Sequence, residues 1–323
     1  MYSRLSTKAT YLLLLRLCLL ALPVDAQQRA QQPAFPENIA SEVSSLRDQA
    51  DRGDAIAAYR LGRLYMTGTG VTSDYTEAAK YLRAAAEHDL TEAEFVLGYL
   101  YENGKGVPQD YRRAFDYYAA AARQGHLTSA NNLAAMYEYG RGVRKDIHKA
   151  VDWYEHAAKR GDVVAQVNLA ALYFRGRGVA QDYAKAAQWF RKAAESGYPA
   201  GQQMLAWMYF TGKGVPQDYA ATANWLLLAA QASDPLAETE LGDLYEQGKG
   251  VPLDYVTAYM WYKTAQSGGD GRAGKRLKSL SRLMTRQQIR QANAEASDLS
   301  SSMSKGQEVQ HSQNIESALN PER

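Results

Sequence analysis

Two stretches of the sequence read GKGVPQDY, at 104–111 and again at 212–219, and each holds a glycine-lysine-glycine loop that could cradle a phosphate group. A phosphate-binding P-loop requires a serine or threonine directly after its Gly-Lys pair and a buried strand before it. Here Gly106 follows Lys105, and a helical pattern of apolar residues precedes the loop. Other copies of the loop carry threonine or arginine in place of the lysine. The sequence therefore predicts a structural loop and not a nucleotide site.

Other residues that could do chemistry stand isolated in the sequence. Ser302 and Lys305 match the serine-lysine spacing of penicillin-binding enzymes, but they lie in a serine-rich tail without the companion motifs of those enzymes. His148 and His156 are eight residues apart, and none of the five histidines has a partner at metal-ligand spacing. We therefore predict no catalytic residue, no metal site and no cofactor, and we expect surface or capping roles for the histidines.

The N-terminus has the pattern of an export signal. A basic start precedes an apolar run at 11–22, and Val24-Asp25-Ala26 places small residues at the −3 and −1 positions of a cleavage site. This pattern predicts a signal peptide at 1–26, cleaved or retained, and hence a periplasmic or secreted protein. An internal or anchored N-terminus is the alternative, because Arg16 interrupts the apolar run.

The charge balance does not favour nucleic acid as a partner. The chain has 37 basic and 35 acidic residues, and removal of 1–26 takes away three basic and one acidic residue, which leaves 34 of each. A mature chain with a formal charge of zero has no global attraction for nucleic acid. Cys18 is the only cysteine and lies within 1–26, so the mature chain would have no disulfide and no cysteine nucleophile.

A 36-residue repeat organises the chain. A pair of glycines around one variable residue recurs six times without an insertion; a valine follows each pair, and an aspartate comes three positions after the valine. The glycine pairs are Gly68/Gly70, Gly104/Gly106, Gly140/Gly142, Gly176/Gly178, Gly212/Gly214 and Gly248/Gly250. Such periodicity is typical of stacked repeat architectures.

Each repeat is predicted to contain two helices, helix A before the glycine pair and helix B after it. A leucine and a tyrosine four residues apart, such as Leu97 and Tyr101, mark one face of helix A. Helix B is rich in alanine and carries one bulky layer, which includes Tyr118 in the second repeat. This composition suits antiparallel helix pairs that stack closely.

The loop between the helices has the same predicted role in every repeat. Its first glycine ends helix A in the left-handed conformation, its valine fills the gap between the helices, and its aspartate caps helix B. In the two identical copies, these loop residues are Gly104, Gly106, Val107 and Asp110, and Gly212, Gly214, Val215 and Asp218.

The residues outside the array are predicted to close its two ends. Thr285 and Gln288 have the spacing of a capping box, which opens a last polar helix to about Ala296. The predicted segments are a signal peptide at 1–26, a flexible lead-in at 27–37, an N-terminal capping helix at 38–53, six repeats at 54–269, C-terminal capping helices at 270–297 and a disordered tail at 298–323.

The unit A-x3-L-G-x2-Y-x2-G-x-G-V-x2-D-x3-A-x6-A-A, best written at 93–122, resembles the Sel1-like repeat, a relative of the tetratricopeptide repeat. The resemblance covers 54–269. It implies an all-α fold, a right-handed α-solenoid of six helix-loop-helix repeats with capping helices, in which the helix A surfaces line a concave groove. Family members mostly act as protein-binding adaptors. Exported bacterial members include periplasmic regulators, polysaccharide-secretion scaffolds and host-interaction proteins.

The leucine that marks helix A, Leu97 in the second repeat, is called here the signature leucine. By analogy with tetratricopeptide arrays, the positions two before, two after and five after this leucine should face the groove. These positions change from repeat to repeat, and aromatics beside amides are the composition of a binding hot spot. The predicted groove residues are Tyr59, Arg63, Phe95, Tyr99, Asn131, Phe174, Gln203, Trp207 and Phe210. Packing between repeats is the alternative role for each of them. Basic residues are scarce on these rows, which disfavours recognition by a carboxylate clamp.

The sequence therefore predicts an exported, non-enzymatic scaffold that binds a peptide or helix of another protein in its groove, as a periplasmic regulator or a host-interaction factor. Neither nucleic acid nor a stable membrane span after signal cleavage is expected. One alternative is an enzyme that acts on β-lactams or the cell wall, although ordered segments offer no nucleophile–base pair and the cysteines of β-lactam-binding relatives are missing. The other is a polysaccharide-secretion scaffold whose aromatics stack on sugars.

Overall fold

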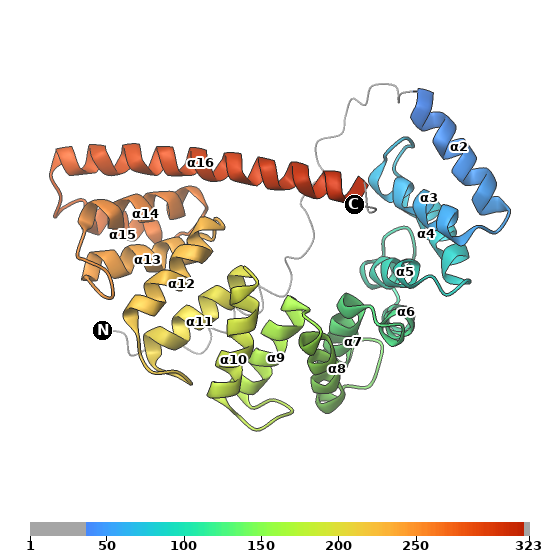
Figure 1. The fold of residues 1–323 in the computed structure, drawn as a ribbon, viewed down its shortest axis with the longest axis horizontal. Coiled ribbons are helices and arrows are strands. Elements are labelled where there is room, and N and C mark those ends of the chain that lie inside the picture. Colours follow the sequence, from blue (N-terminus) through green and yellow to red (C-terminus); the bar gives the residue numbers. More distant parts are fainter. Residues whose placement is uncertain (1–36, 320–323) are drawn as a thin grey trace. The chain divides into compact units, whose positions relative to one another are not determined.

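The computed structural model describes residues 37–319, with side chains described at 41–302, so the predicted signal peptide lies outside the described residues. This part of the chain contains fifteen α-helices and no strand (Figure 1). The helices are α2 (Glu37–Asp51), α3 (Ala55–Thr67), α4 (Tyr75–Ala86), α5 (Thr91–Asn103), α6 (Tyr111–Arg123), α7 (Leu127–Tyr139), α8 (Ile147–Lys159), α9 (Val163–Arg175), α10 (Tyr183–Glu195), α11 (Pro199–Thr211), α12 (Tyr219–Gln231), α13 (Pro235–Gln247), α14 (Tyr255–Ser267), α15 (Ala273–Leu280) and α16 (Arg286–Leu319). From α3 to α14 each helix A is followed by its helix B, which confirms the prediction of an all-α solenoid of six repeats.

The chain divides into two compact units, Met1–Ala150 and Val151–Arg323, called here the N-terminal unit and the C-terminal unit. In the described part of the N-terminal unit, each helix from α2 to α7 packs on the next one along the chain. In the C-terminal unit the same holds from α9 to α14, and α14 also packs against α15 and α16. Each unit therefore builds its core from contacts between neighbours in the sequence, as repeat arrays do.

The loop residues start and stop the helices. Gly104 and Gly212, which follow α5 and α11, have left-handed backbones with φ of 65° and 70° and donate their N–H groups to carbonyl oxygens of the last helical turn. This conformation costs a residue with a side chain about 1–2 kcal/mol. Asp110 accepts hydrogen bonds from two backbone N–H groups in the first turn of α6 at 2.9 and 3.0 Å, and Asp218 accepts one in α12 at 2.9 Å. Each such cap contributes about 1 kcal/mol.

The second glycine of the loop allows two repeats to approach closely, a role that the sequence did not reveal. A Cβ atom at Gly106 would lie 2.1 Å from the carbonyl oxygen of Tyr75, and one at Gly214 would lie 2.2 Å from that of Tyr183. Tyr75 and Tyr183 are the first residues of helix B in the preceding repeat. The half-buried valines Val107 and Val215 follow in the same loops. This loop, called here the hinge, thus joins two helices of one repeat and also touches the backbone of the repeat before it.

Alanines and one bulky layer form the core of each repeat. The signature leucines of helix A are at most 1 % exposed, and so are the helix B residues Tyr118, Phe190 and Tyr262. Gly98 lies against the ring of Tyr118, where a Cβ atom would come within 2.6 Å of the ring. Burial of one such large side chain contributes on the order of 2–3 kcal/mol. The small residue after the signature leucine therefore makes room for the bulky layer of helix B.

The C-terminal end of the array differs from its predicted form. Thr285 and Gln288 form the reciprocal bonds of a capping box: Gln288 Oε1 accepts from the Thr285 N–H at 2.9 Å, and Thr285 Oγ1 accepts from the Gln288 N–H at 3.3 Å. The sequence predicts an end near Ala296 and a disordered tail from 298, whereas α16 continues as a helix to Leu319. The segment 297–319 has no proline and only one glycine, and its serine, glutamine and glutamate residues tolerate a helix.

Candidate functional site

In the N-terminal unit, the predicted groove residues Tyr59, Arg63 and Tyr99 lie at least partly exposed on helix A. The half-buried ring of Tyr59 lies beneath the guanidinium of exposed Arg63, which is 6.0 Å from the ring centroid. Tyr99 is half-buried, and its hydroxyl accepts a hydrogen bond from Lys105 Nζ at 2.8 Å. These residues form two small local pairs, and the described contacts do not join them into one cluster.

Apart from Tyr59 in the first repeat, the position two before the signature leucine is a packing position. Asn131 is 7 % exposed and Gln203 is 5 % exposed, so neither amide is free to meet a partner. Phe95 is half-buried between the rings of His126 and Tyr118, with centroids 4.5 and 6.2 Å away. The sequence could not separate this position from the exposed ones, because its residues vary for reasons of packing between neighbouring helices.

The other predicted groove residues, Phe174, Trp207 and Phe210, lie among further aromatic rings in the C-terminal unit. The Phe174 ring meets Trp207 edge-on with centroids 5.5 Å apart, and it meets Tyr183 edge-on at 5.0 Å. The Phe210 ring meets Tyr219 edge-on at 5.4 Å. All five rings are half-buried, so each one keeps part of its surface in contact with solvent.

Two lysines lie over these rings. Lys213 Nζ is 5.3 Å from the centroid of Trp207 and 5.4 Å from that of Tyr183, and Lys249 Nζ is 5.7 Å from the centroids of both Phe210 and Tyr219. An ammonium group at this distance from an aromatic face gains about 0.5–1 kcal/mol at an exposed site. We call the following residues the aromatic–lysine cluster: Phe174, Tyr183, Trp207, Phe210, Lys213, Tyr219 and Lys249.

These lysines are the middle residues of the glycine loops, where the sequence suggested only a structural role. The middle basic residue reaches the tyrosine that opens helix B of the preceding repeat, 30 residues earlier. In the N-terminal unit Lys105 lies 5.5 Å from the centroid of Tyr75, and Arg141 lies 5.9 Å from that of Tyr111. The same spacing recurs in both lysines of the aromatic–lysine cluster. A sequence signal for these contacts exists. It is a tyrosine directly after the capping aspartate, followed 30 residues later by a basic residue between the two glycines of the next loop.

The residue five positions after the signature leucine is chemically complementary to the bulky core residue of helix B in the same repeat. In the second repeat the core residue Tyr118 donates its hydroxyl hydrogen to Glu102 at 2.9 Å. Burial and the neighbouring Glu102 carboxylate raise the pKa of Tyr118, which therefore stays a donor. In the fourth repeat the core residue is Phe190, no hydroxyl needs an acceptor, and the same position holds Phe174. The aromatic character of the cluster thus accompanies an apolar core layer.

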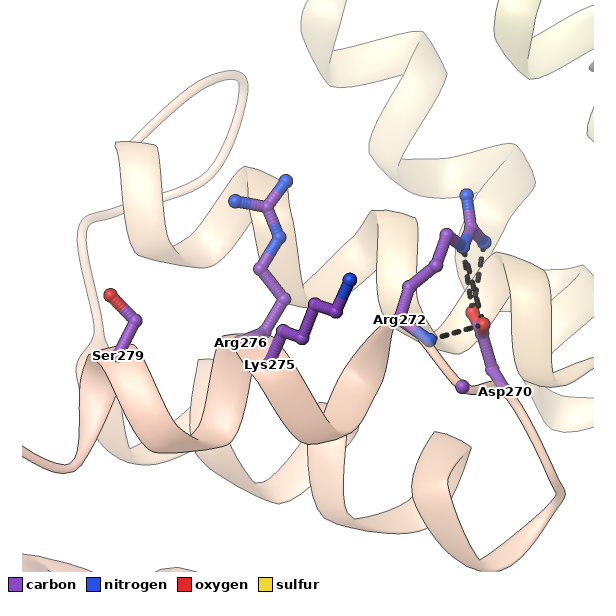
Figure 2. A pocket seen from close by; sticks show the side chains of 6 residues that line it. Asp270, Arg272, Lys275, Arg276 and Ser279 are labelled. Atoms are coloured by element: carbon purple, nitrogen blue, oxygen red, sulfur yellow. Dashed lines mark hydrogen bonds and ion pairs between the residues drawn. The ribbon is translucent and has the colours of Figure 1, made fainter.

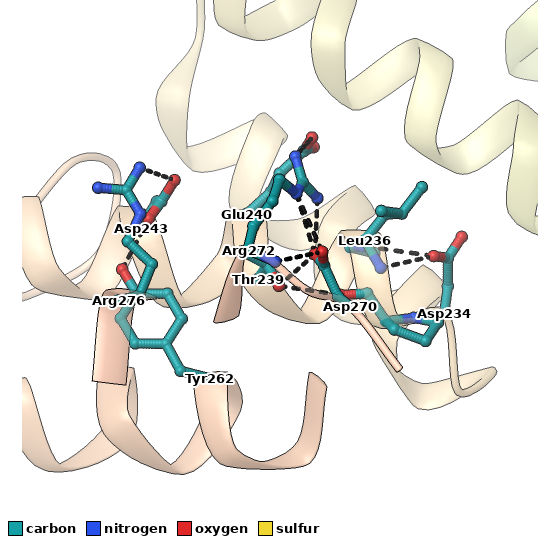
Figure 3. A network of polar contacts seen from close by, with 11 residues as sticks. Asp234, Leu236, Thr239, Glu240, Asp243, Tyr262, Asp270, Arg272 and Arg276 are labelled. Carbon is teal, nitrogen blue, oxygen red and sulfur yellow. Dashed lines mark hydrogen bonds and ion pairs between the residues drawn. The ribbon is translucent and has the colours of Figure 1, made fainter. Parts of the chain in front are cut away.

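A polar network lies at the last repeat (Figure 3). Asp270 accepts hydrogen bonds from the Arg272 guanidinium at 2.9 Å and from Thr239 Oγ1 at 2.7 Å. Arg276 donates to Asp243 at 2.9 Å. Burial alone would raise the pKa of Asp270, but hydrogen bonds from Arg272 and Thr239 outweigh it and lower that pKa below its ordinary value.

A surface pocket of about 580 Å³ adjoins this network (Figure 2). It is lined by Asp270, Gly271, Arg272, Lys275, Arg276 and Ser279. Because both of its arginines already pair with carboxylates of the protein, this pocket fits a role in holding α15 against the array better than a role in binding an anion.

Metal binding and membrane insertion find no support among residues 37–319. The described part of the chain has no group of three or more His, Cys, Asp or Glu side chains placed to hold a metal ion. None of its described helices is long and apolar enough to cross a membrane.

Comparison with known proteins identifies the repeat. The Sel1 repeat family matches residues 55–90, 91–126, 128–162, 163–198, 199–234 and 235–270. A protective antigen of uropathogenic Escherichia coli strains with an SLR fold is 35 % identical, with a TM-score of 0.73 over 79 % of this chain and 56 % of that protein. This chain thus spans little more than half of the antigen. A Sel1 repeat protein from Oxalobacter formigenes is 30 % identical, with a TM-score of 0.61 over 69 % of this chain and 88 % of that protein. No curated protein matches this chain.

Sel1 repeat arrays are typical scaffolds of protein–protein interaction, and their solenoid fold is generally non-enzymatic. The family matches cover more than half of the chain, and their boundaries follow the helix pairs from α3–α4 to α13–α14. The chain therefore belongs to the Sel1 repeat family.

Proposed function

We propose that the protein is an exported, non-enzymatic scaffold whose C-terminal unit holds a segment of another protein against the aromatic–lysine cluster. The observation that carries this proposal is the set of edge-on contacts among half-buried rings: Phe174 with Trp207 and Tyr183, and Phe210 with Tyr219. Clustered aromatic anchors at a surface are the usual source of binding energy in protein interfaces.

The positions of these anchors favour binding without large rearrangement. Phe174, Trp207 and Phe210 lie on the last turns of α9 and α11, which end at left-handed glycines. The edge-on contacts between rings restrict their rotation before a partner arrives. Side chains that are already ordered lose little conformational entropy on binding, and this raises affinity.

The proposal of export depends on the N-terminal pattern at 1–26, which lies outside the described residues. We expect cell fractionation to place the protein outside the cytoplasm. Mass spectrometry of the purified protein should find a mature N-terminus at Gln27. A cytoplasmic protein that begins at Met1 would contradict the export proposal and would leave the binding proposal untouched.

A pull-down from envelope extract of the source organism tests the binding role. The double variant Trp207→Ala/Phe210→Ala removes two anchors, and we expect it to lose the partners that the native protein captures. Trp189→Ala/Leu228→Ala is the matched control, since it removes an aromatic and an apolar side chain from helix B surfaces outside the cluster. Circular dichroism should show that both variants remain helical. Identical partners at identical yields with Trp207→Ala/Phe210→Ala would remove the cluster from consideration as the binding site.

A further inference from the structure

We infer that the segment bound by the aromatic–lysine cluster is acidic, with carboxylates placed against Lys213 and Lys249; this inference rests on the binding role proposed above. Both ammonium groups lie over aromatic rings. Neither forms a hydrogen bond or an ion pair with any residue that the structure describes. The two positive charges at this site are therefore uncompensated within the described part of the chain.

Two basic groups elsewhere in the array are compensated by carboxylates. In the N-terminal unit, Arg141 forms an ion pair with Glu102 at 3.7 Å. At the end of the C-terminal unit, Arg272 pairs with Asp270 at 2.9 Å. Lys213 and Lys249 differ from these two arginines because they lie over half-buried aromatic rings and form no ion pair with a described residue.

Most helices around the cluster carry little negative charge. Helices α9, α11 and α12 contain no acidic residue, whereas α13, which Lys249 follows, contains four. Across 163–231 the acidic residues are Asp182, Glu195 and Asp218, and the basic residues are Arg175, Arg177, Lys185, Arg191, Lys192 and Lys213. Two of the three acids cap α10 and α12, and Asp182 also pairs with Lys185 at 3.8 Å. Within 163–231, basic residues therefore outnumber acidic residues by six to three.

The arrangement of rings and ammonium groups favours a protein segment over a sugar or a nucleic acid. Sugars and nucleobases stack on open aromatic faces, but here Lys213 lies over the face of Trp207, and Lys249 lies over that of Phe210. The exposed parts of the rings are left to contact apolar side chains, while the ammonium groups receive carboxylates. A segment in which Asp or Glu alternates with apolar residues fits both features, and charge complementarity of this kind sets specificity and association rate.

Selection from a library of random twelve-residue peptides displayed on phage tests the inference. We expect peptides selected on the native full chain to be enriched in Asp and Glu, and we expect Lys213→Gln/Lys249→Gln to lose that enrichment. The matched control is Lys192→Gln, because Lys192 also lies over a ring, that of Trp189 at 4.2 Å, but outside the cluster. Fluorescence anisotropy of the most enriched peptide should then show about tenfold weaker binding when its acids become amides, which corresponds to about 1.4 kcal/mol.

The outcomes separate this inference from the proposed function. Selected peptides without acidic enrichment, or tighter binding of a heparin fragment or a single-stranded oligonucleotide than of the best peptide, would overturn the acidic-segment inference. In the envelope pull-down, loss of partners with Trp207→Ala/Phe210→Ala but not with Lys213→Gln/Lys249→Gln would keep the binding site and reject its acidic specificity. If neither double variant changes capture, the proposed function itself fails.

Discussion

The two GKGVPQDY segments have the same eight residues and the same hinge geometry, but their lysines have different neighbours. In both copies the glutamine donates to a carbonyl oxygen at the end of helix A at 2.8 Å and to the next tyrosine hydroxyl at 3.0 Å. Lys105 donates to the hydroxyl of Tyr99, and this hydrogen bond raises the pKa of Lys105. Lys213 lies over Trp207, whose indole ring offers no acceptor. Identical sequence thus gives an internally satisfied lysine in the N-terminal unit and a free cation in the C-terminal unit.

This difference shows that sequence identity between two repeats does not separate structural from functional residues. The hinge residues are fixed by the backbone, and they serve the fold in both copies. The middle residue acquires its chemistry from helix A and from the preceding helix B, which lie 6 and 30 residues away in the sequence. The following predictions test which parts of the two copies are equivalent and which are not.

The largest expected effect is the same in both copies. Gly106→Ala and Gly214→Ala should each reduce the free energy of unfolding by about 3 kcal/mol, because a new Cβ atom would overlap a carbonyl oxygen and the backbone is left-handed. Gly125→Ala and Gly197→Ala are controls with a positive φ but no atom within 4 Å of the new Cβ, and they should cost only about 1 kcal/mol. Denaturant unfolding measures all four variants. Equal costs for the two pairs would show that the close approach between repeats is not rigid.

The position three before the signature leucine is buried and also differs between repeats. It holds Glu94 in the second repeat, Gln202 in the fifth and Glu238 in the sixth. Burial, with a smaller contribution from Asp234, raises the pKa of Glu238 to about 8. The folded state therefore holds a proton that the unfolded state releases above its ordinary pKa near 4.5, so stability falls as the pH rises from about 4.5 to about 8.

Glu238→Gln should remove this loss. We expect the variant to be about 2 kcal/mol more stable than the native protein at pH 9 and nearly equal to it at pH 4.5. The glutamine can donate to a carbonyl oxygen eight residues earlier, as Gln202 does to Ala194 at 3.3 Å. Denaturant unfolding at several pH values measures the difference, and a stabilisation that does not change with pH would contradict a protonated Glu238.

The complementarity between the bulky core residue of helix B and the residue five after the signature leucine can be tested by substitution in the fourth repeat. Phe190→Tyr places a hydroxyl where the neighbouring position is Phe174 and not a carboxylate, so we expect a loss of about 1–2 kcal/mol in thermal or denaturant unfolding. Adding Phe174→Glu should recover part of this loss by recreating the pair of Tyr118 and Glu102. A double variant less stable than the sum of both single changes would show that the two positions are not coupled in this way.

The smallest expected effect separates the two lysines. Lys105→Met should cost about 0.5–1 kcal/mol because it removes a hydrogen bond as well as a cation–π contact. Lys213→Met removes only cation–π contacts and should cost less than Lys105→Met, about 0.5 kcal/mol. A larger loss of stability for Lys213→Met would indicate a structural role and would weaken its assignment to binding.

The fold follows from the sequence because each repeat repeats its local signals. The 36-residue period, the pairing of Leu97 with Tyr101 and the capping Asp110 each depend on residues within one helix or one turn. What the sequence did not show depends on contacts between repeats. The approach of Gly106 to Tyr75, the burial of Asn131 and the lysines over aromatic rings all join residues of different helices, which a pattern within one repeat does not encode.

The contact between the second hinge glycine and the preceding repeat has a genetic consequence. Gly106, Gly142, Gly214 and Gly250 each meet the backbone of the tyrosine that opens the preceding helix B, so these repeats are joined in the same way. Recombination between the DNA of the two GKGVPQDY segments would delete 104–211, three whole repeats, and would join α5 directly to α12 through an intact hinge. In the shortened chain Gly214 would meet the carbonyl of Tyr75 as Gly106 does now. A deletion of whole repeats would therefore keep the contact between neighbouring repeats. The same deletion would remove Phe174, Trp207 and Phe210 in a single step.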